Sequence, residues 1–168
     1  LKLSRGLGDV YKRQALSVAF SIGVSDKIIK KGLKNFKGVQ RRFNYLFEKN
    51  QIPFFDDYAH HPTEIESVLD GVKKVYNEEE IVCIFQPHRI SRVRSLKKEF
   101  SKCFKKANTI LLCPIYKAGE NIKLGFSYES FAKLIAKNSN VNLIMLKNEQ
   151  ELKKIIKNIT FGKKIFIA

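Results

Sequence analysis

The stretch Ile81-Val-Cys-Ile-Phe-Gln-Pro-His-Arg89 joins a short apolar run to a loop that carries a histidine and an arginine. An apolar run of this length, bounded by polar residues, predicts a buried strand. Leu96, Phe100 and Phe104 follow at a spacing of four residues, which predicts a helix whose apolar face packs against that strand. A strand followed by an amphipathic helix is the repeating unit of α/β folds.

The same alternation extends over most of the chain on both sides of this stretch. Strands are predicted over residues 42–48, 52–55, 81–85, 109–113, 141–146 and 164–167, and further helices over 15–23, 26–35, 62–76, 128–138 and 149–158. The first two strands suit a hairpin, and Pro62 suits the first turn of a helix. Because alternating strands and helices imply right-handed crossovers, we expect an α/β fold, Rossmann-like, with a mostly parallel sheet and helices on both faces.

The composition is strongly basic. The 168 residues include 32 Lys and Arg against 16 Asp and Glu, a formal net charge of +16. Such an excess favours a polyanion as partner, so a basic α/β module that binds nucleic acid or another polyanion is one alternative function. Most of these residues are lysines scattered through every segment, as on a solvated surface, and we therefore expect no nucleic-acid partner. The arginines cluster at Arg41-Arg42 and between Arg89 and Arg94, where their planar groups suit phosphate or carboxylate.

Two further classes of protein are disfavoured. The chain has no apolar run approaching the roughly 20 residues of a membrane-spanning helix, and its first residues lack the apolar core of a secretory signal. We therefore expect a cytoplasmic protein with no membrane partner. Cys83, Cys103 and Cys113 form no Cys-x-x-Cys pair, so we expect them to be core residues rather than disulfides or zinc ligands.

Polar side chains gather in three loops, each directly after a predicted strand. The loops are Asp56-Asp-Tyr-Ala-His-His-Pro-Thr-Glu64, Gln86-Pro-His-Arg-Ile-Ser-Arg-Val-Arg94 and Pro114-Ile-Tyr-Lys-Ala-Gly-Glu120. In an open α/β sheet, ligands bind in the crevice beyond the carboxyl ends of the strands. We therefore expect these three loops to form one site, and the other strand ends to contribute little to it.

The first loop offers carboxylates and imidazoles ahead of a helix. Asp57, His60 and His61 are residue types that bind zinc or magnesium, but adjacent histidine side chains do not readily converge on one ion, so no metal site is predicted on this chain. Contact with a nucleotide or substrate is the favoured interpretation, and helix capping is the alternative. Asp57 would accept hydrogen bonds from ribose hydroxyls, as the acidic residue does in dinucleotide folds, and Asp56 would cap or pair.

The second loop predicts an anion pocket made of His88, Arg89 and Arg92. If its helix begins near Ser91, Arg89 crosses a helix N-terminus, where backbone N–H groups and the helix dipole favour an anion. The alternative is a solvated basic helix start, which applies most to Arg94. The sequence contains neither of the glycine-rich phosphate-binding fingerprints, so we infer half of a composite site that another domain completes.

Four motifs in order resemble those of the Mur ligases, the amide-forming ligases of peptidoglycan and cell wall synthesis. The motifs are Phe36-Lys-Gly-Val-Gln-Arg-Arg-Phe43, Asp56-Asp-Tyr-Ala-His-His-Pro-Thr-Glu64, Phe85-Gln-Pro-His-Arg-Ile-Ser-Arg92 and Ile115-Tyr-Lys-Ala-Gly-Glu120. The resemblance implies that residues 15–38 are a helical remnant that ends the central ATPase domain. It implies a C-terminal domain over 39–168, truncated before the family's Gly-rich turn. Residues 1–14 match no part of it and are expected to be foreign or disordered.

The Gln86-Pro-His-Arg89 loop is similar to that of the alanine-adding branch of the family. The resemblance implies an ATP-dependent, Mg²⁺-requiring ligase that joins UDP-N-acetylmuramate to L-alanine through an acyl phosphate. The related branch that attaches a ready-made tripeptide shares the Asp-Asp-x-Ala-His-His-Pro motif and is the alternative. The uridine-nucleotide domain, the phosphate-binding loop and the central-domain metal ligands are absent from this sequence. The chain alone is therefore expected to be inactive and to need the N-terminal and central domains.

Motif positions also imply roles for individual residues. Arg42 is similar to a linker arginine near the γ-phosphate, and would be catalytic and ATP-binding; Asp57 is similar to a residue that contacts the nucleotide ribose. The residues similar to the group that receives the amino acid's carboxylate are His88, Arg89 and Arg92. The residues expected only to line the site are Tyr58, His60 and His61.

Overall fold

A computed structural model of the chain describes residues 7–36, 41–120 and 126–168. The chain divides into two compact units, Leu1–Val39 and Gln40–Ala168. Each unit is described by itself below. Among the described residues, no helix is both long enough and apolar enough to cross a membrane.

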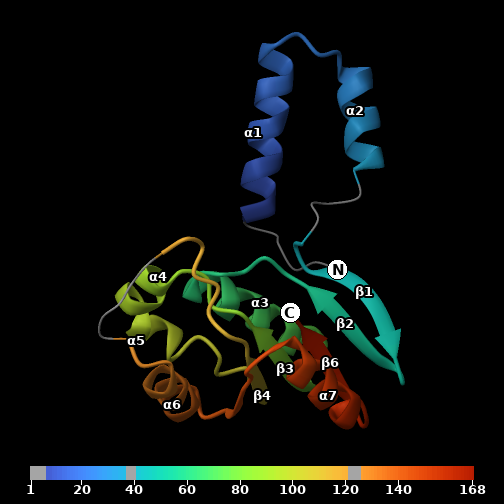
Figure 1. The fold of residues 1–168 in the computed structure, drawn as a ribbon. Helices are drawn as coiled ribbons and strands as arrows, with labels where there is room; N and C mark the ends of the chain where they lie inside the picture. The colour runs from blue at the N-terminus through green and yellow to red at the C-terminus, as the bar shows by residue number, and fades with distance from the viewer. Residues whose placement is uncertain (1–6, 37–40, 121–125) are drawn as a thin grey trace. The chain divides into compact units, whose positions relative to one another are not determined.

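The first unit contains two helices, α1 (Leu7–Ser21) and α2 (Asp26–Asn35), drawn in blue in Figure 1. Helix α1 begins before Ala15, the predicted start, because a helix once nucleated propagates through residues that carry no proline. No residue of α2 is buried. The large apolar side chains that this unit exposes are Val18, Phe20, Ile22, Ile28, Leu33 and Phe36.

The second unit is built on one six-stranded sheet. Its strands are β1 (Asn44–Lys49), β2 (Ile52–Asp56), β3 (Glu80–Phe85), β4 (Thr109–Leu112), β5 (Asn142–Met145) and β6 (Lys164–Ile167). Their order in the sheet is β1-β2-β6-β3-β4-β5. Figure 1 labels all of these strands except β5. Only the β1–β2 pair is antiparallel, and every other neighbouring pair is parallel. The predicted α/β fold with a mostly parallel sheet is confirmed.

Helices cover the two faces of this sheet unequally. The helices are α3 (Pro62–Val75), α4 (Ile90–Ser95), α5 (Lys97–Phe100), α6 (Tyr128–Ser139) and α7 (Glu149–Ile159). One hydrophobic cluster joins α3, α5 and α6 to alternate strand residues such as Cys83 and Ile110. A second cluster joins α7 to the residues between them, such as Val82 and Leu111. This alternation follows from the two-residue period of a strand.

The order of the strands explains why α7 lies alone on its face. The chain moves in one direction across the sheet from β2 to β3, β4 and β5, and the last crossover returns from β5 to β6, between β2 and β3. Because parallel crossovers are right-handed, reversing the direction of travel places the connecting helix on the opposite face.

The helix predicted around Leu96, Phe100 and Phe104 differs in the structure. It is divided at Leu96 into the short α4 and α5, and turns follow up to Ala107. Turn bonds such as the Lys102 N–H to the Glu99 carbonyl replace the regular helical ladder. The apolar residues nevertheless reach the core, because Phe100 and Phe104 are fully buried.

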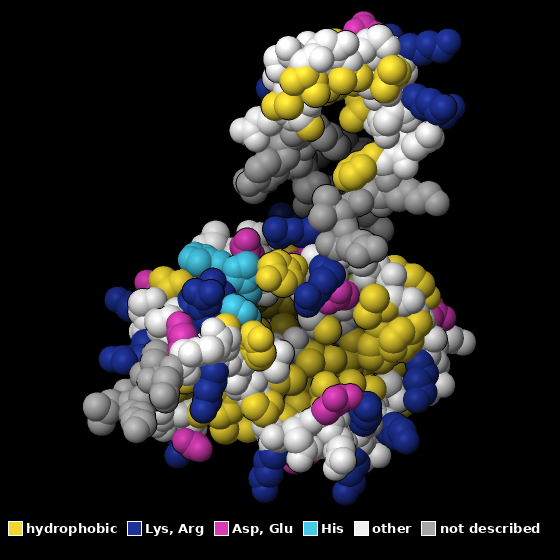
Figure 2. Space-filling model, turned by 45° about the horizontal axis from the view of Figure 1, so that its top comes forward, with side chains coloured by type: hydrophobic (Ala, Val, Ile, Leu, Met, Phe, Trp, Pro, Cys, Tyr) yellow, Lys and Arg dark blue, Asp and Glu magenta, His cyan; other side chains and the backbone are white. Residues whose placement is uncertain are grey.

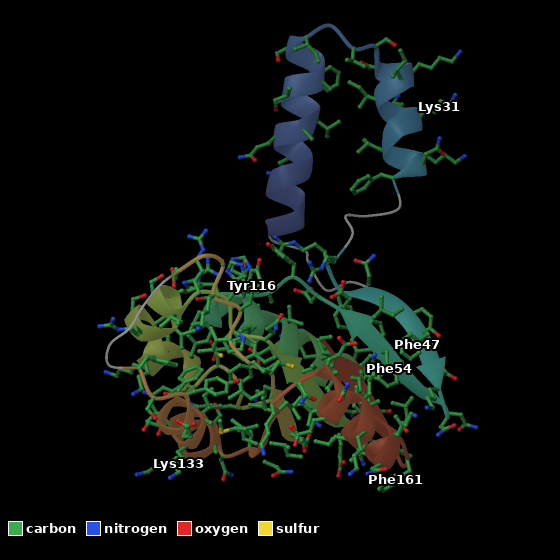
Figure 3. The ribbon with its side chains drawn as sticks, in the orientation of Figure 1. Lys31, Phe47, Phe54, Tyr116, Lys133 and Phe161 are labelled. Carbon is green, nitrogen blue, oxygen red and sulfur yellow. The ribbon has the colours of Figure 1, made fainter. Side chains whose placement is uncertain are left out.

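The β1–β2 hairpin turns tightly at Asn50 and Gln51, whose φ values of 53° and 63° are both positive, as a type I′ turn requires. On one face of the hairpin, Phe47 stacks on Phe54 with ring centroids 4.6 Å apart (Figure 3), and Phe54 stacks on Phe166 of β6 at 4.5 Å. This aromatic row ties the hairpin to the parallel part of the sheet.

Candidate active-site cleft

A cleft of about 1030 Å³ lies at the carboxyl ends of the strands, and residues of all three predicted loops line it. The predicted site residues that it brings together are Asp57, Tyr58, His60, His88, Arg89 and Arg92. Figure 2 shows histidine and basic side chains beside a hollow with an apolar floor, and the apolar residues that line the cleft include Ile84 and Leu152. The expectation that the three loops meet at one edge of the sheet is confirmed.

His88, Arg89 and Arg92 line the cleft and are called its basic wall below. Two of their nitrogen atoms have no hydrogen-bond partner. Within the described part of the chain, His88 Nδ1 and Arg92 Nη1 are buried and make no hydrogen bond. Partial burial and the charges of Arg92 and Arg89 hold the pKa of His88 below its usual value, which favours the neutral imidazole. A buried polar group without a partner costs about 1–3 kcal/mol, so an anion that pairs with these atoms gains affinity there.

The backbone of Arg89 is held in an unusual conformation. Its φ is 68°, in a region of backbone conformation that residues other than glycine rarely adopt. Holding such a residue there typically costs about 1–3 kcal/mol of folding free energy. Two bonds to the loop after β4 hold it there: the Arg89 N–H donates to the Tyr116 carbonyl at 2.8 Å, and the Tyr116 N–H donates to the Pro87 carbonyl at 2.9 Å. The second and third loops therefore form one unit at the sheet edge, where Tyr116 lies (Figure 3).

The helix N-terminus beside Arg89 does not provide the predicted anion position. Helix α4 begins at Ile90, and its N-cap residue Arg89 makes no side-chain capping bond. The carboxylate of Glu120 accepts hydrogen bonds from the Ser91 N–H at 3.0 Å and from the Ser91 hydroxyl. The chain's own glutamate thus occupies this position, and a bound anion would depend on the side chains of His88, Arg89 and Arg92.

Four rings from the three loops form a continuous row across the cleft. The distances between ring centroids are 5.1 Å from Tyr58 to His60, 6.5 Å from His60 to His88 and 5.2 Å from His88 to Tyr116. His60 Nδ1 lies 2.9 Å from the Tyr58 carbonyl oxygen. Because a carbonyl only accepts hydrogen bonds, Nδ1 of His60 carries a proton.

Asp57, in the first cleft loop, is hydrogen-bonded to Phe43, the residue directly before β1. Its Oδ2 accepts a hydrogen bond from the Phe43 N–H at 2.8 Å, and its Oδ1 accepts one from the Ala59 N–H at 2.8 Å. Burial raises the pKa of Asp57, and these two donors together with the charge of Arg42 oppose the shift. Arg41 and Phe43 have φ values of 57° and 51°, so Asp57 helps to hold a strained backbone.

Two predicted residues lie outside the cleft lining. The side chain of Arg42 is exposed, and its charge acts on Asp57 and Glu64 from outside the cleft. His61 caps α3: its Nδ1 accepts from the Thr63 N–H at 3.4 Å, while Glu64 accepts from the His61 N–H at 3.2 Å. For His61, the structure supports the helix-capping alternative rather than a place in the lining.

The cleft also has residues that were not predicted. Arg41 lines the cleft and pairs with Asp56, which was expected to cap or pair, with Nε 3.3 Å from Oδ2; its guanidinium carbon lies 4.8 Å from the Tyr58 ring centroid. Asn148 and Glu149, at the start of α7, line the cleft after β5, a strand end that was expected to contribute little. Strand order was the missing information, because β5 pairs in parallel with β4 and therefore ends at the same edge.

The described residues do not form a metal site. Over 7–36, 41–120 and 126–168, no group of three or more His, Cys, Asp or Glu side chains is placed to hold an ion. In this described part of the chain, Asp57 is not surrounded by enough further side-chain ligands to fit a magnesium ion. Cys83 and Cys103 are buried, as predicted, whereas Cys113 is half-buried and lines the cleft. Burial raises the pKa of the Cys113 thiol, which therefore stays protonated.

The electrostatics of the basic wall can be tested by titration. We expect the pKa of the His88 imidazole to lie below its usual value, and Arg92→Ala to move the titration midpoint upward, because one repelling charge is removed. The measurement is the pH dependence of the His88 ring nitrogen resonances in the 168-residue chain. Arg94→Ala is the matched control, since Arg94 is exposed and is not among the residues that line the cleft. An unchanged midpoint in Arg92→Ala would contradict the proposed electrostatic coupling.

Comparison with known sequences identifies relatives of the whole second unit. The model of the Mur ligase, glutamate ligase domain family matches residues 41–167. The chain is 62% identical over 154 residues to the UDP-N-acetylmuramate–L-alanine ligase of Pelagibacter ubique, covering 92% of this chain and 33% of that protein. It is 41% identical over 138 residues to the same ligase of Agrobacterium fabrum, covering 82% and 29%. The chain thus spans about a third of the length of the curated relatives it matches.

Solved structures show the same fold. The UDP-N-acetylmuramate-alanine ligase of Thermotoga maritima superposes with a TM-score of 0.69 at 26% identity, covering 98% of this chain and 34% of that one. A murein peptide ligase of Psychrobacter arcticus superposes with a TM-score of 0.70 at 25% identity, covering 96% and 33%. The family match over residues 41–167 shows that the chain belongs to the Mur ligases and carries their glutamate ligase domain.

Proposed function

We propose that the chain is the C-terminal domain of a UDP-N-acetylmuramate–L-alanine ligase and that its cleft receives the alanine. The cluster of His88, Arg89 and Arg92, with two unpaired buried nitrogens at the carboxyl ends of the strands, is the observation that carries this proposal. Its positive charge suits a carboxylate. The curated relatives that carry this ligase name support the choice of reaction.

In the proposed reaction, the muramyl carboxylate takes the γ-phosphoryl group of ATP, which gives an acyl phosphate and ADP. The alanine amine then attacks the acyl carbon, and inorganic phosphate and a proton are released as the amide forms. The task of this chain is to hold the amino acid. The guanidinium groups of Arg89 and Arg92 would bind its carboxylate through paired N–H donors, with His88 beside them. Holding the carboxylate fixes the direction of the amine, which lowers the entropic cost of its attack.

The nucleotide side of the proposal involves Arg42 and Asp57. Each oxygen of Asp57 accepts one backbone hydrogen bond, which leaves each a further lone pair for a ribose hydroxyl. Arg42 is exposed beside the same loop, where a neighbouring domain carrying ATP could meet it near the γ-phosphate. The sequence contains no phosphate-binding fingerprint, and the residues that the structure describes form no magnesium site, so ATP phosphates and the metal would be held mainly by the central domain.

The first unit is proposed to be the end of that central domain. Its described side chains form no core, and apolar residues such as Phe20, Ile28 and Phe36 are exposed. A group of exposed apolar side chains favours a surface that packs against further protein.

The proposed substrates of the full-length enzyme are a nucleotide-linked sugar and ATP. We therefore propose that the full-length enzyme works in the cytoplasm.

The two alternatives receive less support. The murein peptide ligase superposes as well as the alanine ligase does, so the fold alone does not separate these reactions. The alanine-adding reaction is favoured because the curated relatives described above bear that name, one at 62% identity. The structure supplies no observation that favours a polyanion-binding module.

The proposal is tested by comparing the 168-residue chain with the full-length protein that contains it. We expect the full-length protein to release phosphate from ATP only when UDP-N-acetylmuramate and L-alanine are both present. We expect the chain alone to bind nucleotide weakly and to form no product. Robust ATP turnover by the chain alone, or turnover by the full-length protein that ignores L-alanine, would contradict the proposal.

A further inference from the structure

Glu120 connects two of the three cleft loops through its side chain. It lies in the loop after β4, and its carboxylate accepts the Ser91 N–H at 3.0 Å and the Ser91 hydroxyl at the first turn of α4. The backbone of its own loop is fixed nearby, because the Glu120 N–H donates to the Lys117 carbonyl at 3.0 Å. These bonds and the attraction of Arg89 hold the pKa of the Glu120 carboxyl below its usual value.

The contact matters because it lies directly beside the most unusual residue of the cleft. Ser91 is two residues after Arg89, whose φ of 68° must be imposed by its surroundings. On one side, Arg89 is fixed by its N–H bond to the Tyr116 carbonyl at 2.8 Å. On the other side, Glu120 fixes the first turn of α4. Both partners come from the same loop, so the loop after β4 clamps Arg89 from both directions.

Capping by Glu120 also replaces a missing local cap. Helix N-termini are usually stabilised by the side chain of the N-cap residue, but Arg89 occupies that position and makes no such bond. The guanidinium of Arg89 has only N–H donors, so it cannot accept hydrogen bonds from the backbone N–H groups of the first turn. Glu120 provides the acceptor instead, next to Arg89, which is among the residues that line the cleft.

We propose that Glu120 is a positioning residue: by capping α4 through Ser91, it holds Arg89 in the orientation that binds the amino acid's carboxylate. This inference rests on the proposed function of the cleft. It assigns Glu120 no contact with substrate. The effect of Glu120 on the reaction is therefore expected in the affinity for the amino acid and not in the affinity for ATP.

The first test uses the full-length ligase. We expect Glu120→Ala to raise the KM for L-alanine about tenfold and to leave the KM for ATP unchanged, since one or two hydrogen bonds that orient Arg89 are lost. Ser91→Ala should act in the same direction with a smaller effect. Because both residues belong to one contact, the double variant should be no worse than Glu120→Ala alone. Glu120→Gln, which keeps an acceptor oxygen, should recover part of the affinity.

Glu129→Ala is the matched control, because Glu129 is an exposed glutamate that also accepts a serine hydroxyl, from Ser127, but does not line the cleft. It should leave both KM values unchanged. An unchanged KM for L-alanine in Glu120→Ala overturns the inference. So does an equal rise in both KM values together with a lower Tm, which would indicate a purely structural role.

The second test does not depend on ligase activity. The second unit has two hydrophobic clusters of its own, so the 168-residue chain can be studied by NMR. We expect the Arg89 HN–Hα coupling constant, which reports φ, to change in Glu120→Ala and to stay the same in Glu129→Ala. If the wild-type full-length protein shows no alanine-dependent turnover, the proposed function fails. The Arg89 coupling constant would still show whether Glu120 holds the backbone of Arg89. An unchanged coupling overturns the clamp.

Discussion

Arg89→Ala in the full-length ligase is expected to raise the KM for L-alanine by about 30- to 150-fold. The estimate assumes loss of about 2–3 kcal/mol, which is typical of a hydrogen bond to a charged group. The KM for ATP should change far less, because the nucleotide contacts are proposed for Arg42 and Asp57. Arg92 and His88 remain beside the carboxylate in this variant, and for this reason we expect weakened binding rather than complete loss.

The measurement is the alanine dependence of phosphate release at saturating ATP. Arg89→Lys separates charge from shape: it keeps the charge but loses the planar fork, so an intermediate KM is expected. Arg94→Ala is the control on the same helix, because Arg94 is exposed and does not line the cleft. If Arg89→Ala has the alanine dependence of the wild type, the assigned role of Arg89 is wrong.

The parts of the fold that local sequence patterns encode were predictable. The strand over Ile81 to Phe85 and the helix that opens at Pro62 were found where the patterns placed them. The alternation of apolar side chains along β3 also explains why both faces of the sheet are covered. The meeting of three polar loops at one edge followed from the parallel strands alone.

The features that the sequence did not reveal depend on contacts between distant segments. Nothing near Ser91 indicates that Glu120 would cap its helix, because the two residues are 29 positions apart. Asn148 reaches the cleft only because β5 pairs with β4. His61 and His60 are chemically identical neighbours, and only the geometry of the α3 capping box distinguishes the capping residue from the one that lines the cleft.

Phe131→Ala is expected to lower the free energy of unfolding of the 168-residue chain by about 3–5 kcal/mol, the usual cost of removing a buried phenylalanine. Phe131, on α6, is fully buried, and its ring contacts those of Phe100 and Phe126 at centroid distances of 6.1 Å and 5.7 Å. The cavity would open in the cluster that joins α5 and α6 to the sheet. Guanidinium denaturation followed by circular dichroism measures the change.

Phe161→Ala is the matched control, since the same atoms are removed from a side chain that is 65% exposed (Figure 3). Its cost should be about 1 kcal/mol or less, even with the contact between Lys164 and the Phe161 ring at 5.2 Å. Equal costs for the two variants would show that the cluster does not stabilise the unit. Because the same cluster fixes the strand ends that carry the cleft, the His88 resonances of Phe131→Ala should be lost in the same transition as its secondary structure. A cleft that melted earlier would mean that the loop contacts of Tyr116 and Glu120, rather than the core, set its stability.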